Sequence, residues 1–345
     1  MNILLVRLSA IGDIVFASPL IATLRRAYPQ ARITWLVQPE YRGLLDQHPD
    51  LDEIIVCPLG HWRRLWHTGR LRALWAGIRA LQANLKARHF DLAIDLQGLL
   101  KSGVLTWISG ARERIGLGSR EGSRWLMTRT IPRGGDPGRI GSEYLYLAQT
   151  LGLPAGDFRM GIHFGEAEAS FAAGVIADRD LVEGYAVLCP FTTRPQKHWV
   201  EERWAELAVR LDRELGLTPV LLGGPAERDS AARIRDAADG PLVDLTGETG
   251  LAEAAALIAR AALLVGVDTG LGHMGIAFGT PSLLLFGSTR PYLDTDRANA
   301  RVLYHPLDCS PCKRRPTCEG AFTCMHLVTV DEVLNAARLV IGCTP

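Results

Sequence analysis

The loop RLSAIGD, from Arg7 to Asp13, places a cation, a hydroxyl and a carboxylate directly after an apolar run. Asp13 is expected near the start of a helix, where two interpretations of it stay open. It could cap the helix, because a carboxylate there accepts hydrogen bonds from free backbone N–H groups. It could also be an ionised base that removes a proton from a hydroxyl. The loop has a single glycine, so it lacks the G-x-G-x-x-G pattern of NAD and FAD enzymes.

The loop FTTRPQKHW, from Phe191 to Trp199, groups two hydroxyls and two cations around a proline. Thr192 and Thr193 could donate hydrogen bonds to an oxyanion, and Lys197 could supply a point charge for a phosphate group. The alternative is a polar loop that caps the following helix. The residue types alone favour neither interpretation.

A third loop, VDTGLGHM from Val267 to Met274, leads from an expected strand into a glycine-rich helix start. The backbone N–H groups and the dipole of such a start attract phosphate groups, so a diphosphate would fit there. The alternative is an ordinary strand–turn–helix junction in which Asp268 caps the helix and His273 packs in the core. Between these two loops, Glu227 follows another expected strand and could accept hydrogen bonds from a sugar or ribose.

A basic and aromatic stretch could face an anionic partner. Its members are His61, Trp62, Arg63, Arg64, Trp66, His67, Arg70, Arg72 and Trp75. The cations gather near one end of the stretch, and Lys101 and Arg120 are expected close to them. An anionic acceptor, or the anionic inner leaflet of a membrane, would be attracted to such a face. The alternative is a solvated helix face with its tryptophans in the core.

Four cysteines lie within sixteen residues near the C-terminus, in the spacing C-x2-C-x5-C-x5-C. They are Cys309, Cys312, Cys318 and Cys324. Four thiolates match the needs of a tetrahedral structural Zn or Fe site, which would brace the loop without taking part in catalysis. Reduced thiols or adventitious disulfides are the alternative.

The elements expected around these loops alternate in the way that a parallel α/β sheet requires. Strands are expected at 2–8, 32–37, 53–57, 92–96, 185–189, 219–222, 263–267 and 282–286, and helices at 14–28, 62–88, 143–151, 201–215, 227–238, 251–261 and 272–278. The pattern restarts between residues 155 and 183, so we expect two α/β domains, 1–165 and 166–345. Ligands are then expected at the carboxyl ends of the strands, in the cleft between the halves.

The composition of the 345 residues fits a globular protein of two domains. With 48% hydrophobic residues and a net charge of +1, it excludes wholesale disorder and gives no general affinity for nucleic acid. The sequence shows no signal-peptide pattern and no apolar run near the roughly 20 residues that span a membrane, so the cytoplasm is the expected location.

Taken together, the loops resemble those of glycosyltransferase family 9, the bacterial heptosyltransferases of the lipopolysaccharide inner core. The matching segments are RLSAIGD at 7–13, DLQGLLKSG at 95–103, FTTRPQKHW at 191–199 and VDTGLGHMGIAFGTP at 267–281. They follow one another over nearly the whole chain. The resemblance implies a GT-B architecture, in which two Rossmann-like domains face each other across a central cleft. The first domain would bind the acceptor and the second the nucleotide sugar.

The resemblance also implies a role for each matching residue. Asp13 would be the catalytic base, and Lys197 would stabilise the leaving diphosphate. The donor, ADP-L-glycero-D-manno-heptose, would be bound by Thr192, Thr193, Lys197, Glu227, Asp268, Thr269, Gly270 and His273. The carboxylates and phosphates of a Kdo2-lipid A acceptor would meet Arg63, Arg64, Lys101 and Arg120. Transfer would be a single inverting displacement that needs no covalent intermediate and no catalytic metal or other cofactor.

The segment HWRRLW at 61–66 looks most like the heptosyltransferase I subfamily, which adds the first heptose to Kdo2-lipid A. The cysteine segment is similar to that of heptosyltransferase II, and related cysteines bind iron in protein-directed heptosyltransferases, so these acceptors are the alternatives. A lipid acceptor implies peripheral contact with the cytoplasmic face of the inner membrane. Two rivals from other classes are a non-catalytic nucleotide-sugar-binding protein, which Asp13 disfavours, and a nucleotide-sugar 2-epimerase, which the basic stretch disfavours.

Overall fold

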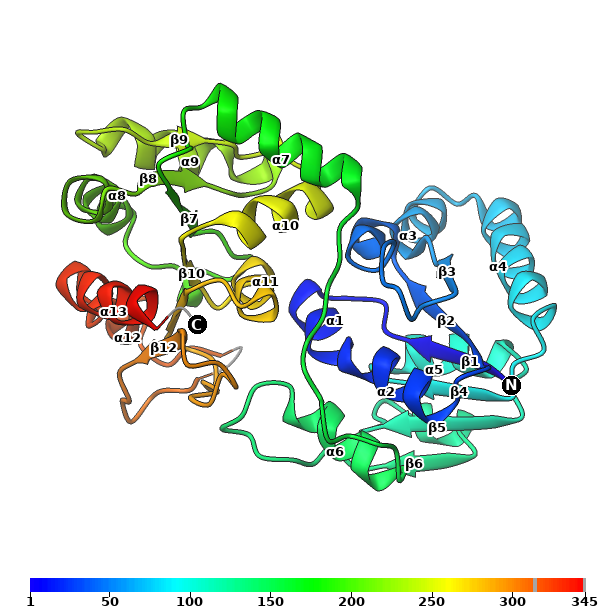
Figure 1. The fold of residues 1–345 in the computed structure, drawn as a ribbon. Coiled ribbons are helices and arrows are strands. Elements are labelled where there is room, and N and C mark those ends of the chain that lie inside the picture. Colours follow the sequence, from blue (N-terminus) through cyan, green and yellow to red (C-terminus); the bar gives the residue numbers. More distant parts are fainter. Residues whose placement is uncertain (313–314, 344–345) are drawn as a thin grey trace. The chain divides into compact units, whose positions relative to one another are not determined.

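The computed structural model describes residues 1–312 and 315–343, and each of its two units is built on a parallel sheet (Figure 1). Unit 1 comprises Met1–Pro137 and Gly141–Gly161, and unit 2 comprises Gly138–Ile140 and Ile162–Pro345. The short segment Gly138–Ile140 belongs to unit 2 because it pairs with Asp294. The N–H of Asp294 donates to Gly138 O, and the N–H of Ile140 donates to Asp294 O, both at 2.9 Å.

Unit 1 has six parallel strands in the order β3-β2-β1-β4-β5-β6. The strands are β1 (Asn2–Val6), β2 (Arg32–Val37), β3 (Glu53–Val56), β4 (Leu92–Asp95), β5 (Glu113–Leu117) and β6 (Arg129–Ile131). The helices are α1 (Ile11–Ala17), α2 (Pro19–Ala27), α3 (Leu59–His67), α4 (Leu71–Lys86), α5 (Leu100–Ile108) and α6 (Ser142–Thr150), with the 3-10 helices η1 (Pro39–Leu44) and η2 (Ser123–Leu126). The central strands β1, β2 and β4 are almost wholly buried, as is typical of a parallel sheet covered by helices.

Unit 2 has six parallel strands in the order β12-β11-β10-β7-β8-β9. The strands are β7 (Tyr185–Cys189), β8 (Thr218–Leu221), β9 (Val243–Asp244), β10 (Leu263–Val267), β11 (Ser282–Phe286) and β12 (Ala300–Tyr304). The helices are α7 (Glu166–Asp178), α8 (Glu201–Leu215), α9 (Arg228–Ala237), α10 (Leu251–Arg260), α11 (Gly270–Phe278), α12 (Thr323–His326) and α13 (Val330–Gly342), with the 3-10 helices η3 (Pro195–Lys197) and η4 (Pro225–Glu227). Both sheets have the 3-2-1-4-5-6 order of a Rossmann fold, which confirms the expected pair of Rossmann-like domains.

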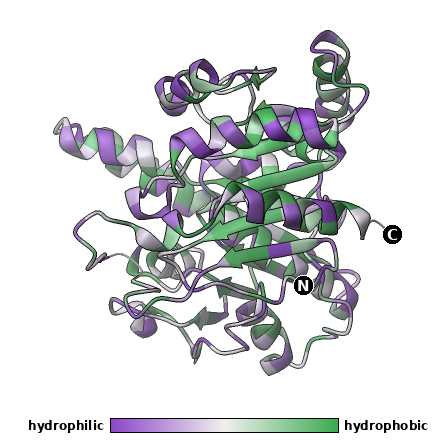
Figure 2. Cartoon of the chain, turned by 90° about the vertical axis from the view of Figure 1, so that its left-hand side faces the viewer, coloured by the Kyte–Doolittle hydropathy of each residue, from purple (hydrophilic) through white to green (hydrophobic). Residues whose placement is uncertain are grey.

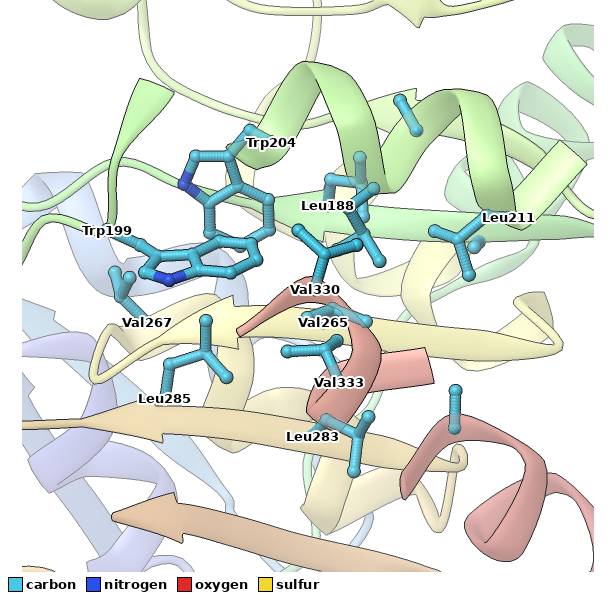
Figure 3. Packing of buried hydrophobic residues seen from close by; sticks show 14 of the residues in the cluster. Leu188, Trp199, Trp204, Leu211, Val265, Val267, Leu283, Leu285, Val330 and Val333 are labelled. Carbon is cyan, nitrogen blue, oxygen red and sulfur yellow. The ribbon is translucent and has the colours of Figure 1, made fainter. Parts of the chain in front are cut away.

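The core of unit 2 anchors one of the polar loops. Trp199 and Trp204 meet edge to face with ring centroids 5.0 Å apart, and Trp199 Nε1 donates to Val328 O at 3.0 Å (Figure 3). The two rings belong to a cluster of buried residues that includes aliphatic side chains of the strands and of α13, among them Leu188, Val265, Val267, Leu283, Leu285, Val330 and Val333. The strands are accordingly the most apolar elements in Figure 2. Burial of Trp199 fixes the end of the loop that carries Lys197.

Two of the expected helices are wrong in extent, because each is divided in the structure. The helix expected at 14–28 begins at Ile11 and is interrupted at Ser18, after which Pro19 starts α2. Proline lacks the N–H that a continuing helix needs, so it favours a new first turn. The helix expected at 62–88 is divided into α3 and α4 at Gly69, whose φ of +69° suits glycine.

Candidate active site

Both sheets reverse their strand order beside their first strand, and the three polar loops begin there. The reversal lies between β1 and β4 in unit 1 and between β7 and β10 in unit 2. In sheets of this kind, ligands bind beyond the carboxyl ends of the strands at such a point. The loop RLSAIGD follows β1, FTTRPQKHW follows β7, and the glycine-rich loop follows β10. Each unit therefore carries its chemistry-bearing loops where its fold binds ligands.

Asp13 lies in the first turn of α1, and one oxygen of its carboxylate is held by two donors. Arg7 forms an ion pair with Oδ2, and the N–H of Ala10 donates to the same oxygen at 3.4 Å. Within residues 1–312 and 315–343 this carboxylate accepts no other hydrogen bond, so Oδ1 keeps its lone pairs. The Asp13 side chain is 42% exposed. Capping of the loop therefore leaves one carboxylate oxygen available for chemistry.

The cation that holds Asp13 is itself buried. The Arg7 side chain is 6% exposed, and its Nη1 donates to Leu96 O at 2.9 Å. Burial opposes the charge of Arg7, but the acidic groups of Tyr144 and Asp13 nearby outweigh burial and raise the pKa of Arg7. Burial also raises the pKa of the Tyr144 hydroxyl, and the nearby charge of Arg7 opposes that rise. This corner of unit 1 thus holds a permanently charged arginine.

A second carboxylate of unit 1, Asp95, shapes the turn after β4. It is fully buried, and its oxygens accept hydrogen bonds of 3.0 Å from the N–H groups of Gln97 and Gly98 and from the Ser102 hydroxyl. Burial raises the pKa of Asp95, and these hydrogen bonds oppose the rise. Because its oxygens already accept hydrogen bonds and are shielded from solvent, Asp95 stabilises the loop that leads into α5 and is not available to bind a ligand.

In unit 2 the loops after β7 and β10 meet at a buried ion pair. Lys197 Nζ pairs with Asp268 Oδ2 and also donates to the Asp268 carbonyl oxygen at 3.2 Å. The Thr289 hydroxyl donates to Oδ2 at 2.6 Å. The Lys197 and Asp268 side chains are only 16% and 12% exposed. Burial alone would raise the pKa of Asp268, but the hydrogen bonds and charges of His273 and Lys197 outweigh burial and hold that pKa well below its usual range.

His273 connects this ion pair to a tyrosine that the sequence did not indicate. His273 Nε2 lies 3.4 Å from Asp268 Oδ1, and His273 Nδ1 lies 2.7 Å from the Tyr292 hydroxyl. Because an ionised carboxylate only accepts hydrogen bonds, the Nε2 atom that faces it carries a hydrogen. Burial, with a further contribution from Asp268, raises the pKa of Tyr292 well above its usual value. His273 is buried, as the alternative interpretation expected, and it also bonds within the polar cluster.

The glycine-rich loop brings the first turn of α11 close to the sheet. Thr269 is the N-cap of α11, so the interpretation of Asp268 as the cap is wrong. The Asp268 oxygens are engaged by Lys197, Thr289 and His273 instead. A Cβ atom on Gly272 would lie 2.4 Å from a methyl carbon of Leu284, so a larger residue there would have to displace that buried side chain. The Thr269 side chain forms no capping bond, which leaves the first N–H groups of α11 for a ligand.

The other expected donor-binding residues also lie in loops at the carboxyl edge of the sheet of unit 2. Neither the hydroxyls of Thr192 and Thr193 nor the carboxylate of Glu227 forms a hydrogen bond within the described part of the chain. The Thr192 carbonyl oxygen lies 2.8 Å from His198 Nε2, which orders the loop. Glu227 ends η4, which follows β8, the strand beside β7. These atoms are available to a ligand at the carboxyl edge of the sheet.

The four cations expected to bind the acceptor are exposed. Arg63 and Arg64 lie on α3, Lys101 lies on α5, and Arg120 follows β5. None of the four pairs with a carboxylate in the two described ranges. Lys101 lies near the buried thiol of Cys57. Burial raises the pKa of that thiol to about 12, and the positive charge of Lys101 opposes the rise. Because Cys57 lies between the end of β3 and the start of α3, Lys101 lies close to the start of α3.

Exposed tryptophans accompany these cations. Trp66, Trp75, Trp107 and Trp125 are all more than half exposed, whereas Trp62 is buried. They lie on α3, α4, α5 and η2, each of which contacts the next. Residues 59–88 include seven Lys or Arg residues and no Asp or Glu. In the described part of the chain, no helix has the length and apolar character that a membrane crossing requires.

The expected metal site at the cysteine segment is not supported. Cys309 is exposed, whereas Cys324 is buried and packs against Gly287 in the core of unit 2. Among the residues that the structure describes, no group of three or more His, Cys, Asp or Glu side chains is arranged to hold a metal ion. Residues 313 and 314 of the segment lie outside the described ranges. The four cysteines differ in burial, and their thiols are not joined in disulfide bonds.

Comparison with known proteins assigns the family. The model of glycosyltransferase family 9 (heptosyltransferase) matches residues 78–322. The chain is 32% identical to lipopolysaccharide heptosyltransferase 1 of Pseudomonas aeruginosa over 96% of this chain and 90% of that protein. It is 28% identical to lipopolysaccharide heptosyltransferase 2 of Escherichia coli over 97% of each. The E. coli heptosyltransferase WaaC, solved with ADP-2-deoxy-2-fluoro heptose, matches with a TM-score of 0.73 and 25% identity over 97% of this chain and 98% of that one. The fold is GT-B, and the chain belongs to glycosyltransferase family 9, the heptosyltransferases.

Proposed function

We propose that this chain transfers L-glycero-D-manno-heptose from ADP-heptose to the Kdo of Kdo2-lipid A, in synthesis of the lipopolysaccharide inner core. Its 32% identity to heptosyltransferase 1 of P. aeruginosa over nearly the whole chain supports this acceptor. The neighbour solved with an ADP-heptose analogue supports the donor. Lipopolysaccharide heptosyltransferases 2 and 3 of E. coli are also relatives, so a core that already carries heptose is the alternative acceptor, and a protein is another.

The observation that carries the proposal is the half-engaged carboxylate of Asp13. With Oδ2 held by Arg7, Oδ1 accepts the proton of an acceptor hydroxyl as general base. The hydroxyl oxygen forms a bond to the anomeric carbon of heptose while the bond from that carbon to the diphosphate breaks. Because attack and departure lie on opposite sides of the carbon, the configuration inverts and ADP leaves.

In unit 2 the donor diphosphate is bound by fixed charges and dipoles. Lys197 and the first turn of α11, at Thr269 and Gly270, stabilise the negative charge that grows on the leaving ADP. The hydroxyls of Thr192 and Thr193 donate to the same group, and Glu227 accepts from the ribose. Asp268 contributes by holding Lys197, because its own carboxylate would repel a diphosphate.

The exposed cations of unit 1 bind the acceptor. Arg63, Arg64, Lys101 and Arg120 meet its carboxylates and phosphates. The acceptor lipid lies in a membrane, so we propose that this protein works in the cytoplasm, at the inner leaflet. The stretch 59–88, which combines tryptophans with cations and contains no Asp or Glu, is suited to the headgroup region, where amphipathic rings and positive charges both gain free energy.

The experiment is ADP release from ADP-heptose, with the product identified by mass. Release that depends on Kdo2-lipid A, with one heptose added, supports the proposal. Release only with a heptosylated core assigns the heptosyltransferase II reaction instead, and no release with either points to a protein acceptor or to binding alone. Asp13→Asn should bind ADP like the wild type yet lose at least about 100-fold in kcat, as general-base removal predicts. Near-normal turnover would leave Asp13 as a cap.

A further inference from the structure

Arg7 is a buried residue of unit 1 whose backbone is bonded to β2 and whose guanidinium is bonded to the carbonyl oxygen just beyond β4. Arg7 follows β1. Its backbone N–H donates to Leu36 O at 3.3 Å, and its backbone carbonyl oxygen accepts from Trp35 Nε1 at 3.0 Å. Its Nη1 donates to Leu96 O, just beyond β4. The side chain therefore bridges the two strands at which the sheet reverses, with little freedom to move.

The only charged group that Arg7 pairs with, within residues 1–312 and 315–343, is Asp13. The other buried carboxylate nearby, Asp95, accepts from Gln97, Gly98 and Ser102 instead. Arg7 Nε and the Tyr144 hydroxyl are buried and form no hydrogen bond in the described part of the chain. A buried arginine with an incomplete set of partners is costly to keep, so a purely stabilising role explains it poorly.

We propose that Arg7 is a positioning residue: it fixes Asp13 Oδ2 so that Oδ1 alone is turned toward the acceptor hydroxyl. This rests on the proposed function of Asp13 as the base. A carboxylate at the end of a short side chain turns about its Cβ–Cγ bond unless one oxygen is held. Because Arg7 is anchored to the Leu96 carbonyl, it transfers the rigidity of the sheet to the reacting oxygen.

The test compares three variants of unit 1 arginines. Arg7→Met should lower kcat by about 10- to 100-fold, the loss that a misplaced catalytic group causes, with the KM for ADP-heptose nearly unchanged. Arg7→Lys should recover part of the loss, because an ammonium still pairs with Asp13 but has a single nitrogen, whereas Arg7 uses Nη2 for Asp13 and Nη1 for Leu96 O. Arg25→Met is the matched control, because Arg25 also joins a carboxylate, Asp52, to backbone carbonyl oxygens. It should lower Tm and leave kcat near the wild-type value.

Two results would overturn the proposal. One is a kcat for Arg7→Met close to that of Arg25→Met; the other is no recovery in Arg7→Lys. If Arg7→Met does not fold, Arg7→Gln replaces it, because glutamine removes the charge and keeps a polar amide at the position of Nε in this buried site. A kcat for Arg7→Gln equal to that of the wild type would then be decisive against positioning.

Failure of the proposed function gives a different pattern. If the wild type releases no ADP with either lipid acceptor, heptose transfer to lipid is refuted, and the Arg7–Asp13 coupling is measured by Tm alone. In a double-mutant cycle of Arg7→Gln and Asp13→Asn, a Tm loss in the double variant smaller than the sum of the single losses supports a coupled, position-fixing pair. Additive losses would overturn it.

Discussion

Replacing Lys197 by alanine should destabilise unit 2 as well as impair donor handling. The Lys197 and Asp268 side chains are 16% and 12% exposed, so the substitution leaves a carboxylate buried without its cation. Removing one partner of a buried ion pair costs about 3–5 kcal/mol. Since Thr289 and His273 continue to bond to Asp268, we expect a loss at or just below the lower end of that range, about 2–3 kcal/mol in the free energy of unfolding.

This loss is large enough to measure by calorimetry. In a unit of this size, each kcal/mol shifts Tm by about 2–4 °C, so the Tm of unit 2 should fall by about 4–12 °C. The Tm of the double variant Lys197→Ala/Asp268→Asn should be closer to that of the wild type, because this variant also removes the buried negative charge left without its cation. Arg179→Ala is the control: Arg179 pairs with Glu248 at 3.5 Å, both about half exposed, and such pairs contribute about 0–1 kcal/mol.

The pH dependence has a definite sign. The pKa of Asp268 is lowered by folding, so its ionised form stabilises the fold above the pKa of unfolded Asp, about 3.9, and this contribution is lost as the pH falls further. The Tm gap between wild type and Lys197→Ala should therefore be steady near neutral pH and narrow below about pH 4. Equal melting temperatures at pH 7 would refute the reasoning. A lowered Tm with unchanged ADP affinity would confine Lys197 to a structural role.

Three further outcomes are expected. Tyr292→Phe removes a hydroxyl at the buried histidine and should lower the free energy of unfolding by about 1 kcal/mol and weaken ADP binding in titration calorimetry; wild-type values for both would exclude it from the site. Gly272→Ala should cost about 1–3 kcal/mol by overpacking α11, whereas Gly174→Ala, whose added methyl meets nothing within 4 Å, should leave Tm unchanged or raised; equal effects would contradict the close approach. The double variant Trp66→Ser/Trp75→Ser should sediment less with vesicles containing anionic lipid, and unchanged sedimentation would rule these rings out of membrane contact.

The sequence predicted the central strands well because their apolar runs are continuous. The bounds expected for β2, β7, β10 and β11 are those observed. It did not predict β5 and β6, whose short runs are interrupted by arginine, glycine and threonine and therefore lack a strand pattern. Their pairing beside β4 supplies the context that propensity does not.

The candidate site was predictable as loops but not as contacts. Lys197 and Asp268 are 71 residues apart, and only the parallel pairing of β7 with β10 brings their strand ends together. Thr289 and Tyr292 follow β11 in a segment with no glycine-rich or motif-like pattern, so nothing in the sequence indicated them. The partner of Asp13 was within reach of the sequence, since Arg7 lies in the same motif, but its burial was not.

The engagement of each carboxylate, rather than its position in a motif, distinguishes the base that we propose, Asp13, from Asp268. Asp13 and Asp268 both follow a strand at a point where the sheet reverses, and both pair with a cation. At Asp268, Oδ1 faces His273 and Oδ2 accepts from Lys197 and Thr289, so a new proton would have to displace an existing bond. At Asp13 both bonds fall on Oδ2 and the side chain is 42% exposed. Proton transfer needs an acceptor that is accessible and not yet engaged, and of these two carboxylates only Asp13 offers one.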